Sequence, residues 1–212
     1  VHTLTPTKAG LMMIPMMVGL IGTSTGVGFI IARTGHYKVY PIIGLAITAG
    51  ALFWMSHLSV ETSLKQLGCE FLVFGIGLGM VIQVLVLIVQ NSFPLSQVGT
   101  ATAANNFFRQ IGSALGASLV GSMFIHNMKD EMATRMPEAF QKMGPEGAAY
   151  AEKFGDANGG ANSLTPDLVA SFPQPIEEAI LNSYNDGLTP VIALMVPLVI
   201  VALILLLPLR EE

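Results

Sequence analysis

The chain of 212 residues is 52% hydrophobic and only 11% charged, and its formal net charge is −4. Because soluble domains carry about 25% charged residues, this composition indicates a membrane protein. The small net charge and the lack of a basic patch argue against a nucleic-acid partner. Cys69 is the single cysteine, which excludes an intrachain disulfide and a cysteine-based metal site.

Five apolar runs are long enough to cross a bilayer, which takes about 20 residues in an α-helix. They predict an all-α membrane protein with four spans in residues 1–125 and a fifth in residues 187–212. The predicted spans are 9–32, 39–57, 66–90, 99–124 and 188–207. Val1 is not preceded by an initiating Met or a signal peptide, so we expect a fragment of a longer protein.

A short polar lead, residues 1–8, precedes the first predicted span and contains Thr5-Pro6, which is typical of a helix start. Its glycines recur at spacings that favour close packing against a neighbouring helix: Gly19, Gly22, Gly26 and Gly28. The short turn that follows contains Arg33 and Lys38, both able to reach lipid headgroups. This basic bias assigns the turn to the cytoplasm, and it places residues 126–186 outside.

One face of the third predicted span carries small and amide residues: Gly75, Gly79, Gln83, Val86 and Gln90. Gly75 and Gly79 suit helix packing. Gln83 has two interpretations, a hydrogen bond to a neighbouring helix or a position in the wall of a cavity. Glu70 is expected to reach the outer interface, so the sequence predicts no acidic residue well inside a span.

The fourth predicted span has two unlike faces. At 100° per residue, one stripe carries polar and small residues, with Asn106 and Gln110 on its flank: Asn105, Arg109, Gly112 and Gly116. The opposite side suits lipid: Phe107, Phe108, Ile111, Leu115 and Leu119. Gly112 and Gly116 form a G-x-x-x-G pair that allows close backbone approach within a membrane.

Arg109 admits two interpretations, because a charge at this depth is costly unless it meets protein, water or headgroups. In the first, its long side chain reaches the headgroups of the inner leaflet. In the second, Arg109 faces the helix bundle and makes a directed contact that helps to close a gate.

Residues 126–186 are the only soluble-looking part of the chain, and we expect a long, partly helical outer loop there. Short helices are predicted at 129–140 and 146–154, with further helix starts at Thr165-Pro166 and Gln174-Pro175. The last of these helices is expected to run over residues 175–184.

Catalytic motifs are missing from the sequence: it contains no P-loop, H-E-x-x-H or G-x-S-x-G motif. All four histidines lie at span ends or turns, where an interfacial position is the simpler interpretation: His2, His36, His57 and His126. We therefore expect no enzymatic activity, no cofactor and no metal.

Residues 28–38 read GFIIARTGHYK and resemble the loop signature of the major facilitator superfamily, with Gly28, Arg33 and Gly35 in register. Ala32 replaces the acidic residue of the signature, and Lys38 falls one place late. Residues 4–15, LTPTKAGLMMIP, are similar to the opening motif of EmrB/QacA-type exporters. The segments 99–103, 108–112 and 186–190 resemble the same group.

This resemblance implies the last five spans of a fourteen-span drug:proton antiporter of the bacterial inner (plasma) membrane. Five helices would form most of a C-terminal six-helix bundle, packed against an N-terminal bundle with alternating access between them. The expected partners are the lipid bilayer, the missing N-terminal half, protons and an amphipathic or lipophilic substrate; a periplasmic adaptor is left open. The residues expected in the pathway or gate are Gln83, Asn105, Asn106, Arg109 and Gln110.

Two other interpretations stay open at this point. The first is a major facilitator with a different cargo, such as a siderophore, an amino acid or a sugar. The second is a non-transporting membrane scaffold in which residues 126–186 form a binding module. The two-faced fourth span and the loop signature argue against the scaffold.

Overall fold

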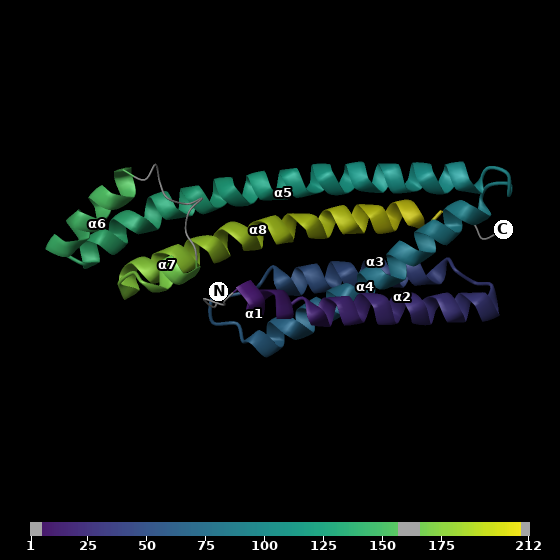
Figure 1. Ribbon diagram of the computed structural model, residues 1–212, viewed down its shortest axis with the longest axis horizontal. Coiled ribbons are helices and arrows are strands. Elements are labelled where there is room, and N and C mark those ends of the chain that lie inside the picture. Colours follow the sequence, from purple (N-terminus) through teal and green to yellow (C-terminus); the bar gives the residue numbers. More distant parts are fainter. Residues whose placement is uncertain (1–5, 157–165, 209–212) are drawn as a thin grey trace.

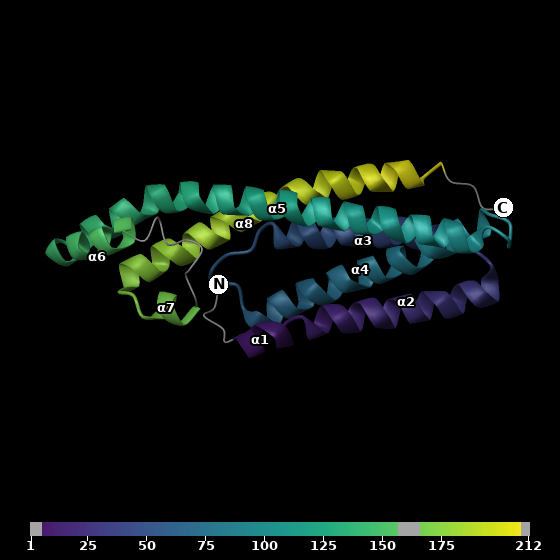
Figure 2. The same cartoon turned by 45° about the horizontal axis from the view of Figure 1, so that its top comes forward.

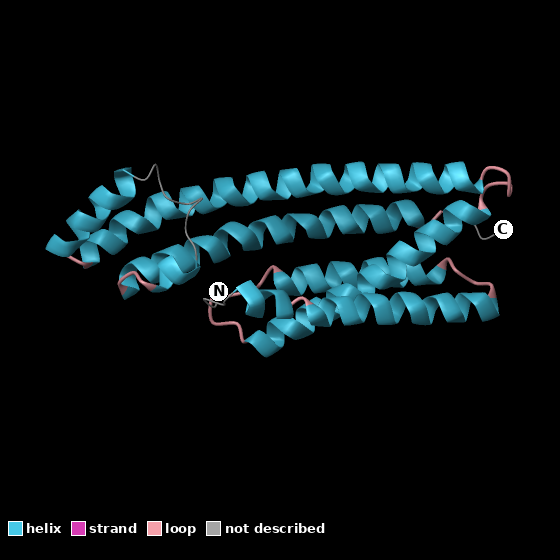
Figure 3. Cartoon of the chain, viewed as in Figure 1, coloured by secondary structure: helices cyan, strands magenta, loops and turns pink. Residues whose placement is uncertain are grey.

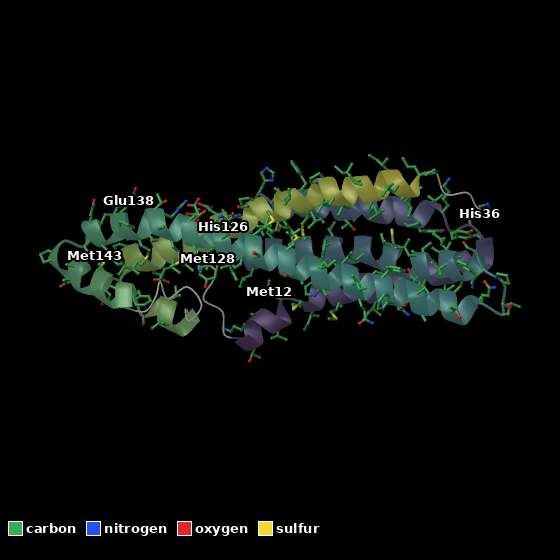
Figure 4. All side chains as sticks on the ribbon, turned by 90° about the horizontal axis from the view of Figure 1, so that it is seen from above. Met12, His36, His126, Met128, Glu138 and Met143 are labelled. Carbon is green, nitrogen blue, oxygen red and sulfur yellow. The ribbon has the colours of Figure 1, made fainter. Side chains whose placement is uncertain are left out.

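In the computed structural model, which describes residues 6–156 and 166–208, all regular structure is helical. The elements are α1 (Pro6–Leu11), α2 (Ile14–Thr34), α3 (Val39–Met55), α4 (Leu64–Asn91), α5 (Val98–Lys142), α6 (Pro145–Asp156), α7 (Pro166–Ala170) and α8 (Gln174–Leu206). Their described connections are short (Figure 3). The molecule is elongated, with His36 near one end and Met143 near the other (Figure 4).

Three stretches are long and apolar enough to cross a membrane: Thr7–Thr34, Leu64–Asn91 and Gln174–Leu206. Helix α3 is a shorter apolar helix of 17 residues. Helix α5 is long but less apolar, because its first half carries amide and glycine residues beside Arg109 and its second half carries most of its charged residues. That α5 crosses the membrane therefore stays a prediction.

Four helices pack in a ring, in which α3 contacts α4 and α8, and α5 contacts the same two helices. Helix α2 packs on α4 at the outside of this ring (Figures 1 and 2). Helices α4 and α5 meet near the turn that joins them and then diverge along their length (Figures 1 and 2).

Glycines set the contact between α2 and α4. A Cβ atom placed on Gly19 would lie 2.6 Å from the carbonyl oxygen of Leu72, and one on Gly79 would lie 2.5 Å from that of Leu20. A Cβ on Gly75 would collide with the backbone of Met16. Each glycine thus allows two helix backbones to touch, which is the packing that small residues favour between membrane helices.

The second half of α5 corrects the sequence prediction. A separate helix is predicted at 129–140, whereas α5 continues without a break to Lys142, over 45 residues. Likewise, the helix that starts at Gln174 does not end near residue 184 but runs on as α8 to Leu206. The physical reason is that these two helices pack against each other beyond the ends of α2, α3 and α4 (Figure 1).

We call this extension the stalk; it consists of residues 124–156 and 166–187. Its core contains buried apolar side chains from α5, α7 and α8: Met128, Met132, Met136, Ala139, Val169, Ile176, Ala179 and Ile180. The four from α5 recur at spacings of three and four residues, which is the apolar stripe of a helix with one buried face. The described parts of the 126–186 segment, residues 126–156 and 166–186, are thus packed around a hydrophobic core.

Polar contacts lie within the stalk and also join it to the turn between α3 and α4. The guanidinium of Arg135 on α5 forms ion pairs with Glu131, at 2.9 Å, and with Asp186 on α8. Asn185 donates a hydrogen bond of 3.1 Å to the carbonyl oxygen of Leu58, in the turn between α3 and α4. The residue after Asp186, Gly187, lets α8 approach the backbone of Met128 closely. The Asp186-Gly187 pair noted in the sequence therefore fixes α8 to α5.

Candidate functional site

The candidate site lies where α4 and α5 diverge. Near the turn that joins these helices, Gln90 Nε2 donates a hydrogen bond of 3.5 Å to Thr102 Oγ1. Gln83 precedes Gln90 by seven residues, and Arg109 follows Thr102 by seven, so each pair lies on one stripe of its helix. At 1.5 Å per residue, Gln83 and Arg109 are both about 10 Å from the Gln90–Thr102 contact. Each of the two side chains thus lies about two helical turns from this contact, Gln83 on α4 and Arg109 on α5.

Four of the predicted pathway residues lie together on α5. Asn105 and Asn106 are half-buried, whereas Arg109 and Gln110 are exposed. Arg109 Nη2 donates a hydrogen bond of 3.1 Å to Asn106 Oδ1, and the Arg109 carbonyl oxygen accepts one from Ser113. Among the described residues, the ion pairs do not include the Arg109 guanidinium.

The fifth predicted pathway residue, Gln83, is exposed and lines a shallow hollow of about 410 Å³ between α4 and α2. The α2 side of this hollow is formed by Ser24, Thr25, Gly28, Phe29 and Ala32. The structure thus brings Gln83 beside small and hydroxyl side chains of α2. Gly28, which the sequence assigns to the loop motif, also lies here.

The predicted packing glycines fall into two groups. Gly75 and Gly79 lie against the backbone of α2, as described above. A Cβ atom placed on Gly112 or Gly116 would have no neighbouring atom within 4 Å, so these two glycines meet no other helix among the described residues. Their packing role stays a prediction about a helix beyond these residues.

The basic turn between α2 and α3 is stabilised by Gly35. Its φ of 75° is left-handed, and its N–H donates a hydrogen bond of 2.8 Å to the Ile31 carbonyl oxygen, which caps α2. Arg33 lies in the last turn of α2, and Lys38 occupies the N-cap of α3. The left-handed cap brings both basic residues to the same end of the helix pair.

Glu70 is the residue that the sequence interpretation missed. The prediction that it reaches the outer interface is wrong, because its side chain is fully buried in α4. Glu70 is one heptad from Gly77 and two from Val84, both buried, and Gly77 contacts Thr48 of α3. This shared stripe is the signal that predicts burial.

The described residues contain no group of three or more His, Cys, Asp or Glu side chains that could hold a metal ion. What the site offers instead is a set of neutral hydrogen-bonding groups around one guanidinium, on otherwise apolar helices. Such a surface can bind an organic solute or another helix.

A sequence model described as Major Facilitator Superfamily matches residues 2–117. An uncharacterized MFS-type transporter of Mycobacterium tuberculosis is 32% identical over 205 residues, which are 97% of this chain and 27% of the relative. A tetracycline resistance determinant of Streptomyces rimosus is 37% identical over 119 residues, covering 56% of this chain and 34% of the relative. The multidrug transporter protein MdtP of Bacillus subtilis is 27% identical over 181 residues, covering 82% and 33%. The chain thus spans between a quarter and about a third of the length of these relatives.

Proposed function

Because this chain belongs to the major facilitator superfamily, we propose that it forms most of the C-terminal bundle of a proton-coupled drug exporter. The exporter would carry amphipathic or lipophilic compounds across the bacterial inner membrane by alternating access. Membership of the family implies a multi-pass membrane protein with a small-molecule substrate. The drug as cargo, the proton as coupling ion and the direction of transport are our proposal.

The observation that supports this proposal is that Gln83 on α4 and Arg109 on α5 are both exposed, each about two helical turns from the Gln90–Thr102 contact. A charged side chain within a membrane helix is stable only where it meets protein or water, or reaches the headgroups. Polar side chains at such a position therefore favour the wall of a water-accessible pathway. Phe107, Leu115 and other large apolar side chains of α5 suit lipid.

The names of the relatives support a drug as the cargo. A tetracycline resistance determinant, a multidrug transporter and an MFS-type efflux pump of Mycosarcoma maydis all match most or about half of this chain. The family match at residues 2–117 includes the region of α2 to α5 that contains the site.

The proposed gate is tested by Arg109→Lys in the complete transporter. Lys reaches headgroups as well as Arg but lacks the planar fork of five donors. We expect the variant to lose most of its export of a fluorescent lipophilic cation from efflux-deficient cells, at matched membrane levels. Arg135→Lys, the same change in the stalk, should retain export. Full activity of Arg109→Lys would remove Arg109 from the gate.

The cargo and the coupling are tested with the unmodified transporter. Export should stop when a protonophore dissipates the proton gradient. If sugars, amino acids or siderophores are carried and no amphipathic compound is, the chain serves another kind of major facilitator.

The proposed orientation places the turn at Arg33–Lys38 in the cytoplasm and the stalk outside. In a Cys69→Ser background, cysteines at His36 and at Glu138, which lie at opposite ends of the molecule (Figure 4), should be labelled from opposite sides. Labelling of both from one side would contradict this topology.

A further inference from the structure

We propose that Glu70 is a proton-binding site. It holds a proton on Oε2 while α4 is packed against α2 and α3. It releases that proton to water at the stalk end when these helices separate. The role of this site in proton-coupled transport rests on the proposed function. The existence of the site is argued from the environment of the Glu70 side chain alone.

Glu70 is an acidic residue in an apolar helix that is long enough to cross a membrane, and its side chain has no solvent-accessible surface. It lies six residues after Leu64, which is about 9 Å along the helix axis. Gln66 Nε2 donates a hydrogen bond of 3.0 Å to Oε1. Oε2 is buried without any hydrogen-bond partner.

An ionised carboxylate in this position would leave a buried charge with an unpaired oxygen, which is costly in an apolar environment. A helix from outside the described residues cannot supply the partner, because the side chain is already fully enclosed. Only a small species can reach Oε2 without separating the helices. A proton meets this condition and also removes the charge.

Within residues 6–156 and 166–208, the charged and titratable groups do not offer Glu70 a counter-charge. The ion pairs among the described residues do not include it. On α2 and α3, the titratable residues are Arg33 and Tyr40, which lie at the opposite ends of those helices. The groups at the near end are all exposed: Lys8 on α1, His57 and Glu61 in the α3–α4 turn, and Lys65 and Cys69 on α4. On α8, Asp186 is paired with Arg135.

The Gln66 hydrogen bond determines which oxygen carries the proton. In a neutral carboxylic acid, Oε1 remains the carbonyl oxygen that accepts from Gln66, and Oε2 becomes the hydroxyl oxygen. On release, the Oε2–H bond breaks, the proton passes to water, and the negative charge stays on the carboxylate. Gln66 is exposed and lies one helical turn away, so the distance to water is short.

Infrared spectroscopy of the complete transporter in lipid tests this inference, because a protonated acid has a C=O stretch that a carboxylate lacks. We expect such a band in the unmodified protein and its loss in Glu70→Gln. Glu61→Gln, which changes an exposed acid nine residues earlier, should keep the band. A band that survives in Glu70→Gln, or the absence of the band from the unmodified protein, would overturn the proposal.

A second variant covers the case in which Glu70→Gln does not fold. Gln66→Leu removes the hydrogen bond to Oε1, so the same band should persist and shift to higher frequency. An unshifted band would mean that it comes from another acid, and loss of the band on adding sodium ions would indicate a metal-cation site instead. The band does not depend on transport. If the transporter exports no drug but shows the band, the proposed cargo is wrong and the proton site at Glu70 is still supported.

Discussion

The unit formed by α2, α3 and α4 and the stalk are both built from packed helices, but they are held together by different side chains. In the α2–α4 contact, glycines bring backbone against backbone, as at Gly19, Gly75 and Gly79. In the stalk, methionine and isoleucine side chains fill the space between α5 and α8, as at Met128 and Ile180.

The difference follows from the solvent that each region is expected to have. Lipid tails are as apolar as leucine, so helices in a bilayer gain little by burying large side chains, and close backbone contact matters more. In water, burial of apolar area stabilises the packing by about 25 cal/mol per Å². One chain therefore uses two kinds of helix contact, and we expect substitutions in them to have different effects.

The largest effect is expected where a glycine lies against backbone. In Gly75→Leu the added side chain meets the backbone of Met16, which cannot rotate away. We expect a loss of at least about 3 kcal/mol, the upper end of the cost of overpacking, with a reduced yield of folded protein. Thermal unfolding in detergent measures it. The control is Gly50→Leu, because Gly50 has open space around it; equal losses in the two variants would contradict glycine packing.

The second effect concerns the core of the stalk. Ile180 is fully buried, so Ile180→Ala should cost about 2–5 kcal/mol and expose the stalk to protease. Cleavage should rise within residues 124–187 and not in the α2–α4 unit. Glu138→Ala, at an exposed stalk position, should leave the cleavage rate unchanged. Cleavage throughout the chain would show that the two regions unfold as one.

The third effect tests whether α5, like α2 and α4, packs against another helix through its glycines. If Gly112 meets a helix beyond the described residues, Gly112→Leu should cost about 1–3 kcal/mol in the complete transporter. Leu115→Ala, on the face assigned to lipid, should cost less because Leu115 is 67% exposed. Thermal stability of both variants decides this, and the reverse order would show that the faces are exchanged.

The smallest effect is expected for the ion pairs of the stalk. Arg135 and Asp186 are partly exposed, and such pairs contribute about 0.2–1 kcal/mol. Arg135→Met should therefore lower stability by no more than about 1 kcal/mol. A double-mutant cycle with Asp186→Asn at two salt concentrations measures the coupling. A cost of several kcal/mol that salt does not reduce would mean that the pair is part of the stalk core.

Apolar periodicity predicted the helices of the α2–α4 unit well. The third predicted span, 66–90, compares with α4 at Leu64–Asn91, and the second, 39–57, with α3 at Val39–Met55. The prediction of the stalk was poorer, because the polar residues around Met132 and Met136 suggested a loop. The spacing of those methionines was visible in the sequence, but the partner that makes it a core, α8, lies about 40 residues further along the chain.

The site was predicted in part. The polar stripe of α5 was visible at 100° per residue, yet its level relative to Gln83 depends on how α4 and α5 meet at Gln90 and Thr102. The stripe that Glu70 shares with Gly77 and Val84 indicated its buried face, but its complete enclosure depends on the neighbours that cover this end of α4. The spacing of residues along the sequence shows which helix faces are polar, whereas tertiary contacts decide which of these faces are enclosed.

The unbroken length of α5 has a mechanical consequence. Its 45 residues form a helix about 68 Å long, so it can act as a lever that extends from the α4–α5 turn to the tip of the stalk. A tilt of only about 5° about its first turn would move the tip by about 6 Å, given that length. Small rearrangements around Arg109 would therefore be amplified at the stalk tip, and a distance probe placed there would report them.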